Sequence, residues 1–386
     1  MMETRILPLE NSTLLDQGSI GNNNTLYDYY DYYNDSSGDY PGYVQLCEND
    51  YVNSFGSIFT QVWYSLIFIF SLIGNILVLW ILMKYEKLRS LTDIFILNLV
   101  TSDLLFTCSL PFWAVDHERG WIFGRVMCKI MSAIFFVGYY SGILLLTLMT
   151  VDRYFAVVHA LPAMRIRGFR YGVVACSVVW CISILAAVPE MIFSEVLVNA
   201  DQGFLCGSSY PKGSELIWQH FGYYLQNILF FLIPFMVIVL SYYKIFNTVV
   251  KCRAKKKQKT VKVIFCIVVV FLLCWAPYNI VIFLYSLHDL QVPSLSTCTA
   301  ANNLSYAFFV SRNIAYFHCC LNPFFYAFVG TKFRERLNRV ASKRFPYLNV
   351  CKETNTSSTK LNSIHNYSDF DLHLQDRVER GAIYPC

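Results

Sequence analysis

Four polar residues stand inside or at the ends of long apolar stretches of this sequence: Asn75, Asp103, Arg153 and Asn322. A polar or charged side chain surrounded by hydrocarbon needs a partner or a function, because leaving it unpaired is unfavourable. The chemistry open to these residue types is hydrogen bonding, ion pairing and the binding of a cation between helices. They are therefore the first candidates for a functional role.

Three of the apolar stretches also contain a mid-span proline, namely Pro234, Pro277 or Pro323. Proline has no N–H to donate and its ring clashes with an earlier carbonyl, so it kinks a helix. Any one such residue, polar or proline, could be a local packing device. Their occurrence together, spread over most of the apolar stretches, indicates more than packing.

The sequence lacks the motifs of common hydrolases. It has no His-Glu-x-x-His, no Gly-x-Ser-x-Gly and no cluster of carboxylates. We therefore expect a protein that is not an enzyme, with no metal centre and no nucleic-acid partner. A channel or transporter would require a continuous polar path, and only a few buried polar groups are seen.

The elements that position these residues are seven apolar runs. Hydrophobic residues make up 55% of the chain and charged residues only 15%, against about a quarter charged in soluble proteins. A bilayer core is crossed by roughly 20 apolar residues in a helix, whose backbone groups pair internally. We predict an all-α membrane protein with a seven-transmembrane helix bundle, whose spans are approximately 59–83, 94–115, 126–151, 171–193, 218–246, 261–287 and 304–329.

The remaining segments complete the predicted domain organisation. Residues 1–58 form an extracellular arm and residues 59–330 the bundle. Residues 331–345 are basic with an apolar side, which predicts a short amphipathic eighth helix on the membrane surface. Residues 346–386 form a Ser/Thr-containing cytoplasmic tail, in which Cys351 is a candidate for palmitoylation.

Charge predicts the orientation. Lys and Arg number 21 in the segments after spans one, three, five and seven, against 4 on the other side. Positive residues accumulate in cytoplasmic loops. We therefore expect a multi-pass plasma-membrane protein with its N-terminus outside and its C-terminus inside. Three Asn-x-Ser/Thr glycosylation sequons agree with an extracellular arm, at Asn11, Asn23 and Asn34.

Only four of the 14 cysteines lie on the oxidising side in this topology: Cys47, Cys128, Cys206 and Cys298. Four cysteines allow three pairings. We favour Cys128–Cys206, which would tie the top of span three to the second outer loop. Cys47–Cys298 would then tie the arm to the third outer loop.

The arm is strongly acidic. Residues 1–58 contain nine acids, one base and eight tyrosines. A solvated, disordered tail explains this composition in part. Tyrosines beside aspartates are also candidates for sulfation and ligand contact, in particular Tyr27, Tyr29, Tyr30, Tyr32 and Tyr33. Such an arm should attract a basic protein and speed its encounter with the membrane bundle.

Motifs in successive spans resemble one family. The set comprises Gly74-Asn75, Asp103, Asp152-Arg153-Tyr154, Trp180, Pro234, Cys274-Trp275-Ala276-Pro277-Tyr278 and Asn322-Pro323-x-x-Tyr326. Over about residues 45–345, it resembles the rhodopsin-like (class A) G-protein-coupled receptors. The segments 109–114 and 318–323, with Trp121-x-Phe123-Gly124, resemble chemokine receptors. The segments 306–315 and 328–334 are most similar to the lymphotactin (XC-type) branch.

The resemblance implies a two-state mechanism. Asp152 and Arg153, beside Tyr154, would hold the cytoplasmic ends closed. Release of Arg153 would open a cavity lined by Tyr242 and Tyr326. Trp275, beside the Pro277 kink, would sense the ligand from above. Asp103, with Asn322 before Pro323, would hold an allosteric sodium ion, the one cofactor that we consider.

It also implies a ligand pocket at the outer ends of the spans. The candidate residues are Tyr64, Trp113, Phe135, Phe136, Tyr278 and Arg312. Each aromatic residue could instead be ordinary packing. Many CC-type chemokine receptors carry Glu where this chain has Arg312, so we expect the pocket to meet an acidic or neutral ligand tip.

The function implied is a receptor that binds a basic chemokine, activates an inhibitory-type heterotrimeric G protein and directs leukocyte chemotaxis. Receptor kinases and arrestin would act on the tail, and the basic loop 251–262 would contact membrane lipid. The alternatives are an atypical, scavenging chemokine receptor or another peptide-binding class A receptor. A dimer is left open.

Overall fold

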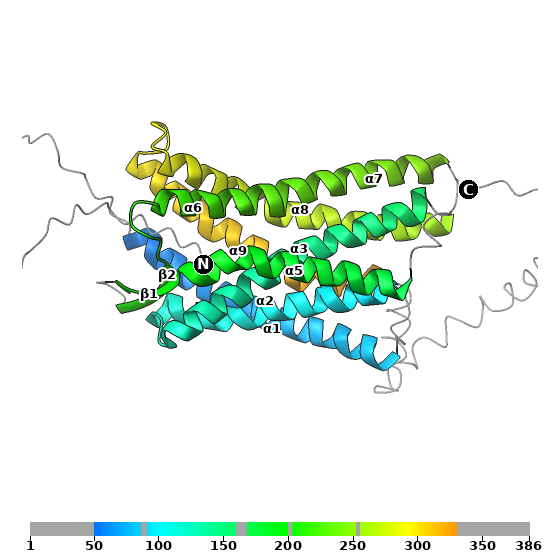
Figure 1. Cartoon of the computed structure of the whole chain (residues 1–386), viewed down its shortest axis with the longest axis horizontal. Coiled ribbons are helices and arrows are strands. Elements are labelled where there is room, and N and C mark those ends of the chain that lie inside the picture. The colour runs from blue at the N-terminus through cyan, green and yellow to red at the C-terminus, as the bar shows by residue number, and fades with distance from the viewer. Residues whose placement is uncertain (1–49, 86–90, 160–167, 200–202, 252–254, 330–386) are drawn as a thin grey trace, which may run out of the picture.

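A computed structural model describes residues 50–85, 91–159, 168–199, 203–251 and 255–329, and Figure 1 shows their helices running side by side along the long axis of the molecule. Six helices are unbroken: α1 (Asp50–Tyr85), α2 (Leu91–Arg119), α3 (Gly124–Val158), α5 (Phe169–Phe193), α8 (Lys255–Asp289) and α9 (Cys298–Val329). A seventh helical segment joins α6 (Glu215–Tyr224), η1 (Leu225–Leu232) and α7 (Ile233–Lys251) without a gap. The seven-helix expectation is confirmed, and the predicted amphipathic helix 331–345 lies outside the described residues.

The helices have the length and surface of membrane spans. Six of the seven segments are long and apolar enough to cross a bilayer by length and composition. The seventh, α9, has 32 residues but carries Arg312, His318 and Asn322 within them. Large apolar side chains such as Ile73 and Leu185 point outward and are exposed. A lipid-facing surface explains that exposure, because hydrocarbon is the solvent there.

Close helix approach depends on small residues. A Cβ added to Gly138 of α3 would lie 2.8 Å from the backbone nitrogen of Phe106 on α2. A Cβ on Gly74 of α1 would lie 2.9 Å from the Pro323 ring on α9. Glycine at these two points lets neighbouring backbones approach, as small residues do in membrane interfaces.

A proline and a wider helical turn coincide in the fifth span. The backbone N–H of Ile233 donates to the carbonyl of Ile228, five residues earlier, at the end of the π-helical stretch η1. The next residue, Pro234, has no N–H to donate, so the regular pairing pattern must shift around it. The proline was visible in the sequence, but the π-helical geometry was not predicted.

A β-hairpin lies across the outer end of the bundle (Figure 1). Strands β1 (Ser194–Asn199) and β2 (Gly203–Ser208) pair antiparallel, from Ser194 opposite Ser208 to Asn199 opposite Gly203. The all-α prediction holds for the bundle but missed this hairpin. Its six-residue strands are too short to stand out beside runs of 20 or more apolar residues.

Two helices extend beyond their apolar runs on the outer side. Helix α1 begins at Asp50, although the apolar run begins at residue 59. Phe55 stacks on Phe59 at 5.2 Å and contacts the Tyr306 ring of α9 at 5.3 Å. Helix α9 begins at Cys298. Side-chain packing between α1 and α9 therefore continues both helices past the hydrocarbon.

Candidate functional site

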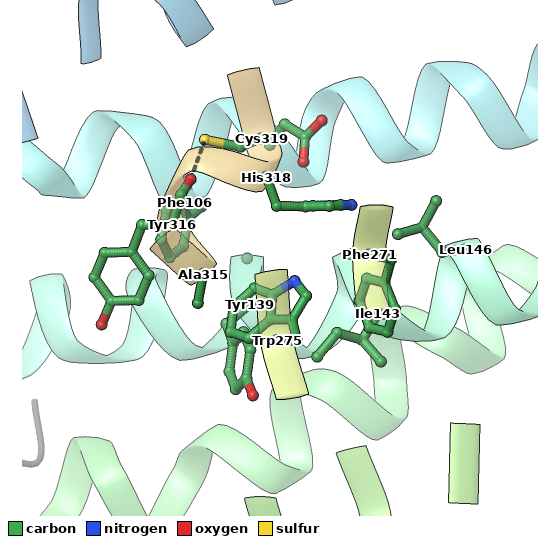
Figure 2. Close-up of a pocket in the computed structure, with 13 residues that line it drawn as sticks. Phe106, Tyr139, Ile143, Leu146, Phe271, Trp275, Ala315, Tyr316, His318 and Cys319 are labelled. Carbon is green, nitrogen blue, oxygen red and sulfur yellow. Dashed lines mark hydrogen bonds between the residues drawn. The ribbon is translucent and has the colours of Figure 1, made fainter. Parts of the chain in front are cut away.

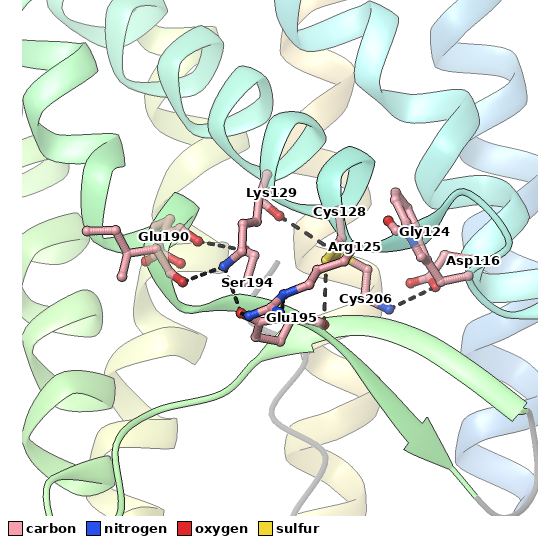
Figure 3. Close-up of a disulfide and its surroundings, with 12 residues drawn as sticks. Asp116, Gly124, Arg125, Cys128, Lys129, Glu190, Ser194, Glu195 and Cys206 are labelled. Atoms are coloured by element: carbon pink, nitrogen blue, oxygen red, sulfur yellow. Dashed lines mark hydrogen bonds and ion pairs between the residues drawn. A yellow bond between two sulfur atoms is a disulfide. The ribbon is translucent and has the colours of Figure 1, made fainter.

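The hairpin is fastened to the top of α3. Cys128 and Cys206 form a disulfide with a Cα–Cα distance of 5.6 Å, as we predicted. On the other side of β2, the backbone N–H of Cys206 donates to Asp116 Oδ1 of α2 at 3.2 Å. Figure 3 shows these contacts meeting at the base of the hairpin. The hairpin is thus held over the outer ends of α2 and α3.

A charged cluster flanks the disulfide (Figure 3). Arg125 Nε lies 2.6 Å from Glu195 Oε2, and Lys129 Nζ lies 2.9 Å from Glu195 Oε1. Hydrogen bonds from Arg125, then from Lys129, lower the pKa of the Glu195 carboxyl below its usual range. Arg125 and Lys129 therefore share one carboxylate, and the three side chains together carry a net positive charge.

The six predicted ligand residues are brought together between the outer ends of the helices. All six side chains are buried: Tyr64, Trp113, Phe135, Phe136, Tyr278 and Arg312. The Phe135 ring contacts those of Phe136 at 5.2 Å and Trp113 at 6.4 Å. We call this group, together with Tyr316, the outer cluster.

Tyr316 of α9 is the centre of the outer cluster, and our sequence prediction did not include it. Its ring centroid lies 5.4 Å from that of Phe135, 5.7 Å from that of Tyr64 and 6.5 Å from that of Tyr278. No local motif distinguishes Tyr316 from the other aromatic residues of α9. Its position follows only from the packing of four helices around it.

Arg312 is a buried cation within this aromatic group, with a side chain only 1% exposed. Its Nη2 atom donates to Thr60 Oγ1 at 3.2 Å and to His117 Nε2 at 3.3 Å. The guanidinium also lies 4.9 Å from the Phe308 ring centroid and 5.7 Å from that of Tyr64. Hydrogen bonds and cation–π contacts, each worth about 0.5–2 kcal/mol, together offset part of the desolvation.

An acid in the same region was also missed. Glu190 lies near the outer end of α5 and is buried. Burial, and secondarily the charge of Glu190, raises the pKa of Tyr210 in the following loop to about 12. The sequence did carry a signal, because Glu190 is a charged residue inside an apolar run, directly after Pro189. Polar residues inside such runs are the candidates that we looked for.

Below the outer cluster lies a small cavity (Figure 2) of about 30 Å³. Figure 2 shows Trp275 and Phe271 of α8, with His318 of α9, facing Ile143 of α3 across it. The Trp275 ring lies 4.5 Å from that of Tyr139 and 6.1 Å from that of Tyr278. Trp275 therefore contacts the outer cluster and also lines the cavity, and its role in sensing a ligand stays a prediction.

Asp103 lines the cavity and accepts a hydrogen bond from Asn322 Nδ2 at 2.8 Å. The two residues that we assigned to the sodium site are therefore hydrogen-bonded to each other. A sodium ion requires several oxygen ligands, as hard cations do. Apart from Asp103, the cavity is lined mostly by apolar side chains, by His318 and by Cys319. These residues do not fit a sodium ion held by several protein oxygens, so we assign no step to such an ion.

At the inner end, Arg153 of α3 donates a hydrogen bond to Thr92 Oγ1 of α2. Its neighbour Asp152 is buried, and Tyr154 hydrogen-bonds to His159 at 3.1 Å. Tyr242 of α7 is buried with Ile238 and Ile245 against the same end of α3. This hydrogen bond of Arg153 links α3 to α2, and the expected pairing of Arg153 with Asp152 stays a prediction.

Several predicted residues lie outside the described part of the chain. Cys298 is disulfide-bonded, but its predicted partner Cys47 is among them. So are the arm tyrosines and sequons, Tyr27, Tyr29, Tyr30, Tyr32, Tyr33, Asn11, Asn23 and Asn34. Tyr326 belongs to α9, but its side chain is not described.

Ring contacts connect the outer cluster to the cavity without a gap. Ring contacts run from Tyr64 to Tyr316, to Tyr278, to Trp275 and on to His318 at the cavity. A ligand that displaces the outer rings would therefore move Trp275 and the cavity walls. Packed groups that have two arrangements can carry energetic coupling, so these rings could couple the outer cluster to the cavity.

Comparison with known proteins gives a consistent family. The family described as "7 transmembrane receptor (rhodopsin family)" matches residues 74–326. The chain is 43% identical to human "Chemokine XC receptor 1" over 296 residues, which is 77% of this chain and 85% of that protein. It is 40% identical to human "C-C chemokine receptor type 8" over 297 residues, 77% of this chain and 82% of that protein.

A relative from another mammal agrees. The "C-C chemokine receptor type 3" of Cavia porcellus is 40% identical over 296 residues, covering 76% of this chain and 82% of that protein. The matched region of each relative therefore includes most of its length.

Proposed function

Because the chain belongs to the rhodopsin family of seven-transmembrane receptors and, within it, to the chemokine receptors, we propose that it binds a chemokine outside the cell and activates an inhibitory-type G protein inside. The observation that carries this proposal is the identity of 40–43% to C-C and XC chemokine receptors over 77% of the chain. The protein is a multi-pass membrane receptor and not an enzyme.

Two features of the outer face support a folded, basic ligand. The arm of residues 1–58 has nine acids and one base, which attracts a basic protein at long range. The hairpin, held by the Cys128–Cys206 disulfide, lies over the bundle's outer end (Figure 1). A protein ligand would contact the arm and hairpin first, and only a narrow part of it would reach the outer cluster.

The inner face favours signalling over scavenging. The Asp152-Arg153-Tyr154 sequence is complete, and Arg153 is held by Thr92 on α2 in this structure. Breaking that contact would free the guanidinium as the cytoplasmic ends separate. A scavenger that only internalises its ligand needs no such releasable contact. In the cell, this signalling would direct leukocyte chemotaxis.

The mechanism is a shift between two conformations. A ligand shifts the equilibrium only by its difference in affinity for the two states. Contacts with the outer cluster supply that difference, because Tyr316 and Tyr278 connect it to Trp275. Pro277 lies inside α8, two residues after Trp275, and a kink at this proline would let the two halves of α8 move separately.

The cytoplasmic tail would allow signalling to be terminated. Residues 346–386 contain several serines and threonines, and their phosphorylation by receptor kinases would create an anionic strip for arrestin. Sulfation of the arm tyrosines would add to its negative charge. Palmitoylation of Cys351 would add a membrane anchor, and the proposal leaves dimerisation open.

Nucleotide exchange tests the proposal. The full chain would be reconstituted with a purified inhibitory-type G protein and exposed to a panel of C-C and XC chemokines. We expect at least one chemokine to accelerate exchange, and Arg153→Ala to abolish the acceleration while ligand binding remains. Binding and uptake with no exchange for any chemokine would favour the scavenging alternative.

A further inference from the structure

Two cations near the outer end of α3 keep hydrogen-bond donors that the mechanism above does not use. Arg125 holds Glu195 through its Nε and Nη2 atoms, at 2.6 and 2.7 Å. Lys129 Nζ pairs with the same carboxylate at 2.9 Å and donates to the Ile192 carbonyl at 2.7 Å. A guanidinium has five N–H donors and an ammonium has three. Within the described part of the chain, the Nη1 amine of Arg125 and one N–H of Lys129 therefore have no partner.

The side of α3 that carries these cations also exposes apolar side chains. Val126 and Ile130 are 69% and 41% exposed, and residues four apart lie on one face of a helix. Arg125 and Lys129, each one residue earlier, form the neighbouring row, and Figure 3 shows both extending toward the start of β1. On α5, Ile192 is 54% exposed. Exposed apolar groups on two adjacent membrane helices indicate a surface that contacts lipid.

The depth of the two cations fits the level of lipid headgroups. The apolar run of the third span begins at residue 126, so Arg125 lies directly outside it. Lys129 lies four residues further along α3, which is about 6 Å of helix. Long basic side chains near the ends of membrane helices extend their charges to the interface while their stems stay among apolar groups. Both charges can therefore reach the headgroup region.

Charge decides which headgroup chemistry fits. Glu195 neutralises one of the two cations, so Arg125, Lys129 and Glu195 together keep a single positive charge. A phosphate diester carries one negative charge, and its oxygens accept hydrogen bonds from both Arg and Lys. The protein ligand proposed above is basic, so this group of side chains would repel it. A phosphate would complete the pairing that one carboxylate leaves incomplete.

We propose that Arg125 and Lys129 bind the phosphate of a membrane phospholipid, whose acyl chains lie against Val126, Ile130 and Ile192. This site is separate from the outer cluster and does not depend on which ligand the receptor binds. Glu195 belongs to β1, so a bound phospholipid would also fasten the base of the hairpin to the bilayer. The competing explanation is that the cations only hold Glu195, and it predicts no preference among lipid headgroups.

Photocrosslinking tests the site on the full chain. Val126 would be replaced by p-benzoylphenylalanine, and the receptor would be placed in vesicles of digalactosyl diacylglycerol, an uncharged lipid without phosphate. The vesicles would contain a minor fraction of phosphatidylglycerol with the same acyl chains. Mass spectrometry of the adducts gives the ratio of phosphatidylglycerol to galactolipid. The same probe at Leu185, an exposed apolar residue of α5, gives the reference ratio, so differences in receptor amount cancel.

We expect the ratio at Val126 to exceed that at Leu185 by about tenfold or more, because two basic residues act together there. Arg125→Gln and Lys129→Gln should each lower this enrichment by about fivefold, the effect of one basic residue near charged headgroups. Glu195→Gln should raise the enrichment, because it removes the carboxylate that competes with phosphate for the same donors.

The effect of Glu195→Gln separates the two explanations. If the cations serve only to hold Glu195, this variant leaves the lipid ratio unchanged. Arg119→Gln is the control for charge alone, because Arg119 is also exposed and paired with an acid, Glu118 of α2. We expect this control to keep the enrichment.

Several outcomes would overturn the proposal. Equal ratios at Val126 and Leu185, or no rise with Glu195→Gln, would show that no phosphate is bound. Loss of the enrichment in millimolar glycerophosphate would assign the site to a free anion. An adduct between the probe and residues 1–49 in place of lipid would show that the acidic arm covers the cations. No chemokine enters these measurements, so their failure would leave the receptor assignment untouched.

Discussion

At the residue scale, the polar side chains inside the bundle are connected to specific partners. Asp103 accepts from Asn322, and Asn75 Nδ2 donates to the Cys319 carbonyl at 3.2 Å. Arg312 donates to Thr60 and His117. Each contact joins two helices, which is how a polar group is tolerated in hydrocarbon. The polar residues therefore fix helix positions as well as providing candidate sites.

Glu195 provides a test of the hairpin's attachment. Its pKa is lowered below the ordinary 4.5 by Arg125 and Lys129, so its pairing stabilises the fold above about pH 4.5 and this contribution is lost as pH falls through the lowered value. The Glu195 side chain is 25% exposed and that of Arg125 71%, so Glu195→Gln should cost only about 1 kcal/mol or less at pH 7.

Thermal unfolding of the purified receptor at several pH values measures this effect. The difference in Tm between Glu195→Gln and the native chain should be constant above pH 5 and shrink toward zero below pH 4.5. A difference that grows on acidification would contradict the assigned sign.

Tyr316 provides a test of the outer cluster. Replacing a buried aromatic ring by alanine destabilises a fold by about 3–5 kcal/mol, and here it also interrupts the path from Tyr64 to Tyr278. Tyr316→Ala should therefore lower thermal stability and reduce the maximal exchange response. Tyr316→Phe keeps the ring contacts and should retain the response. Equal responses from the two variants would show that the ring is not part of the coupling.

At the element scale, close helix packing depends on the positions of glycine residues. The Gly138 position on α3 faces the α2 backbone, and a Cβ there would lie 2.8 Å from the nitrogen of Phe106. Backbone cannot move aside as a flexible side chain can. The short distance between α2 and α3 at this point therefore requires glycine, which has a hydrogen atom where alanine has a methyl group.

Gly138→Ala should destabilise the receptor by about 1–3 kcal/mol, the usual effect of overpacking. Gly168→Ala is the matched control, because a Cβ at Gly168 meets nothing within 4 Å, and its effect should stay below about 1 kcal/mol. Denaturation in detergent, followed by tryptophan fluorescence, would compare the two. If both variants lost a similar amount of unfolding free energy, the close approach of α3 to the α2 backbone at Gly138 would not explain the effect.

At the scale of the whole molecule, seven crossings place the chain ends on opposite sides of the membrane. The acidic arm would then meet ligands outside, and the basic loops would meet G protein and lipid inside. The described helices are consistent with this count, while the direction rests on the charge asymmetry of 21 against 4.

Epitope tags at the two ends test the orientation. In intact cells, antibody should stain an N-terminal tag, and a C-terminal tag should stain only after permeabilisation. Glycosidase treatment should also reduce the apparent mass if Asn11, Asn23 or Asn34 is modified. Staining of both tags in intact cells would rule out an odd number of crossings.

The sequence alone determined the number of helices and the inward polar residues. It favoured Cys128–Cys206 among three possible pairings, and the structure contains that disulfide. The length and polarity of an apolar run can be read locally, and the bilayer requires about the same number of apolar residues, roughly 20, in each span. The hairpin, the π-helical turn before Pro234, the central place of Tyr316 and the burial of Glu190 were decided only by tertiary structure. These depend on how each helix is rotated against its neighbours, which is set by side-chain packing between segments far apart in the chain. Asp103 shows the same division: its burial could be inferred from its neighbours in sequence, but the oxygen-poor lining around it could not.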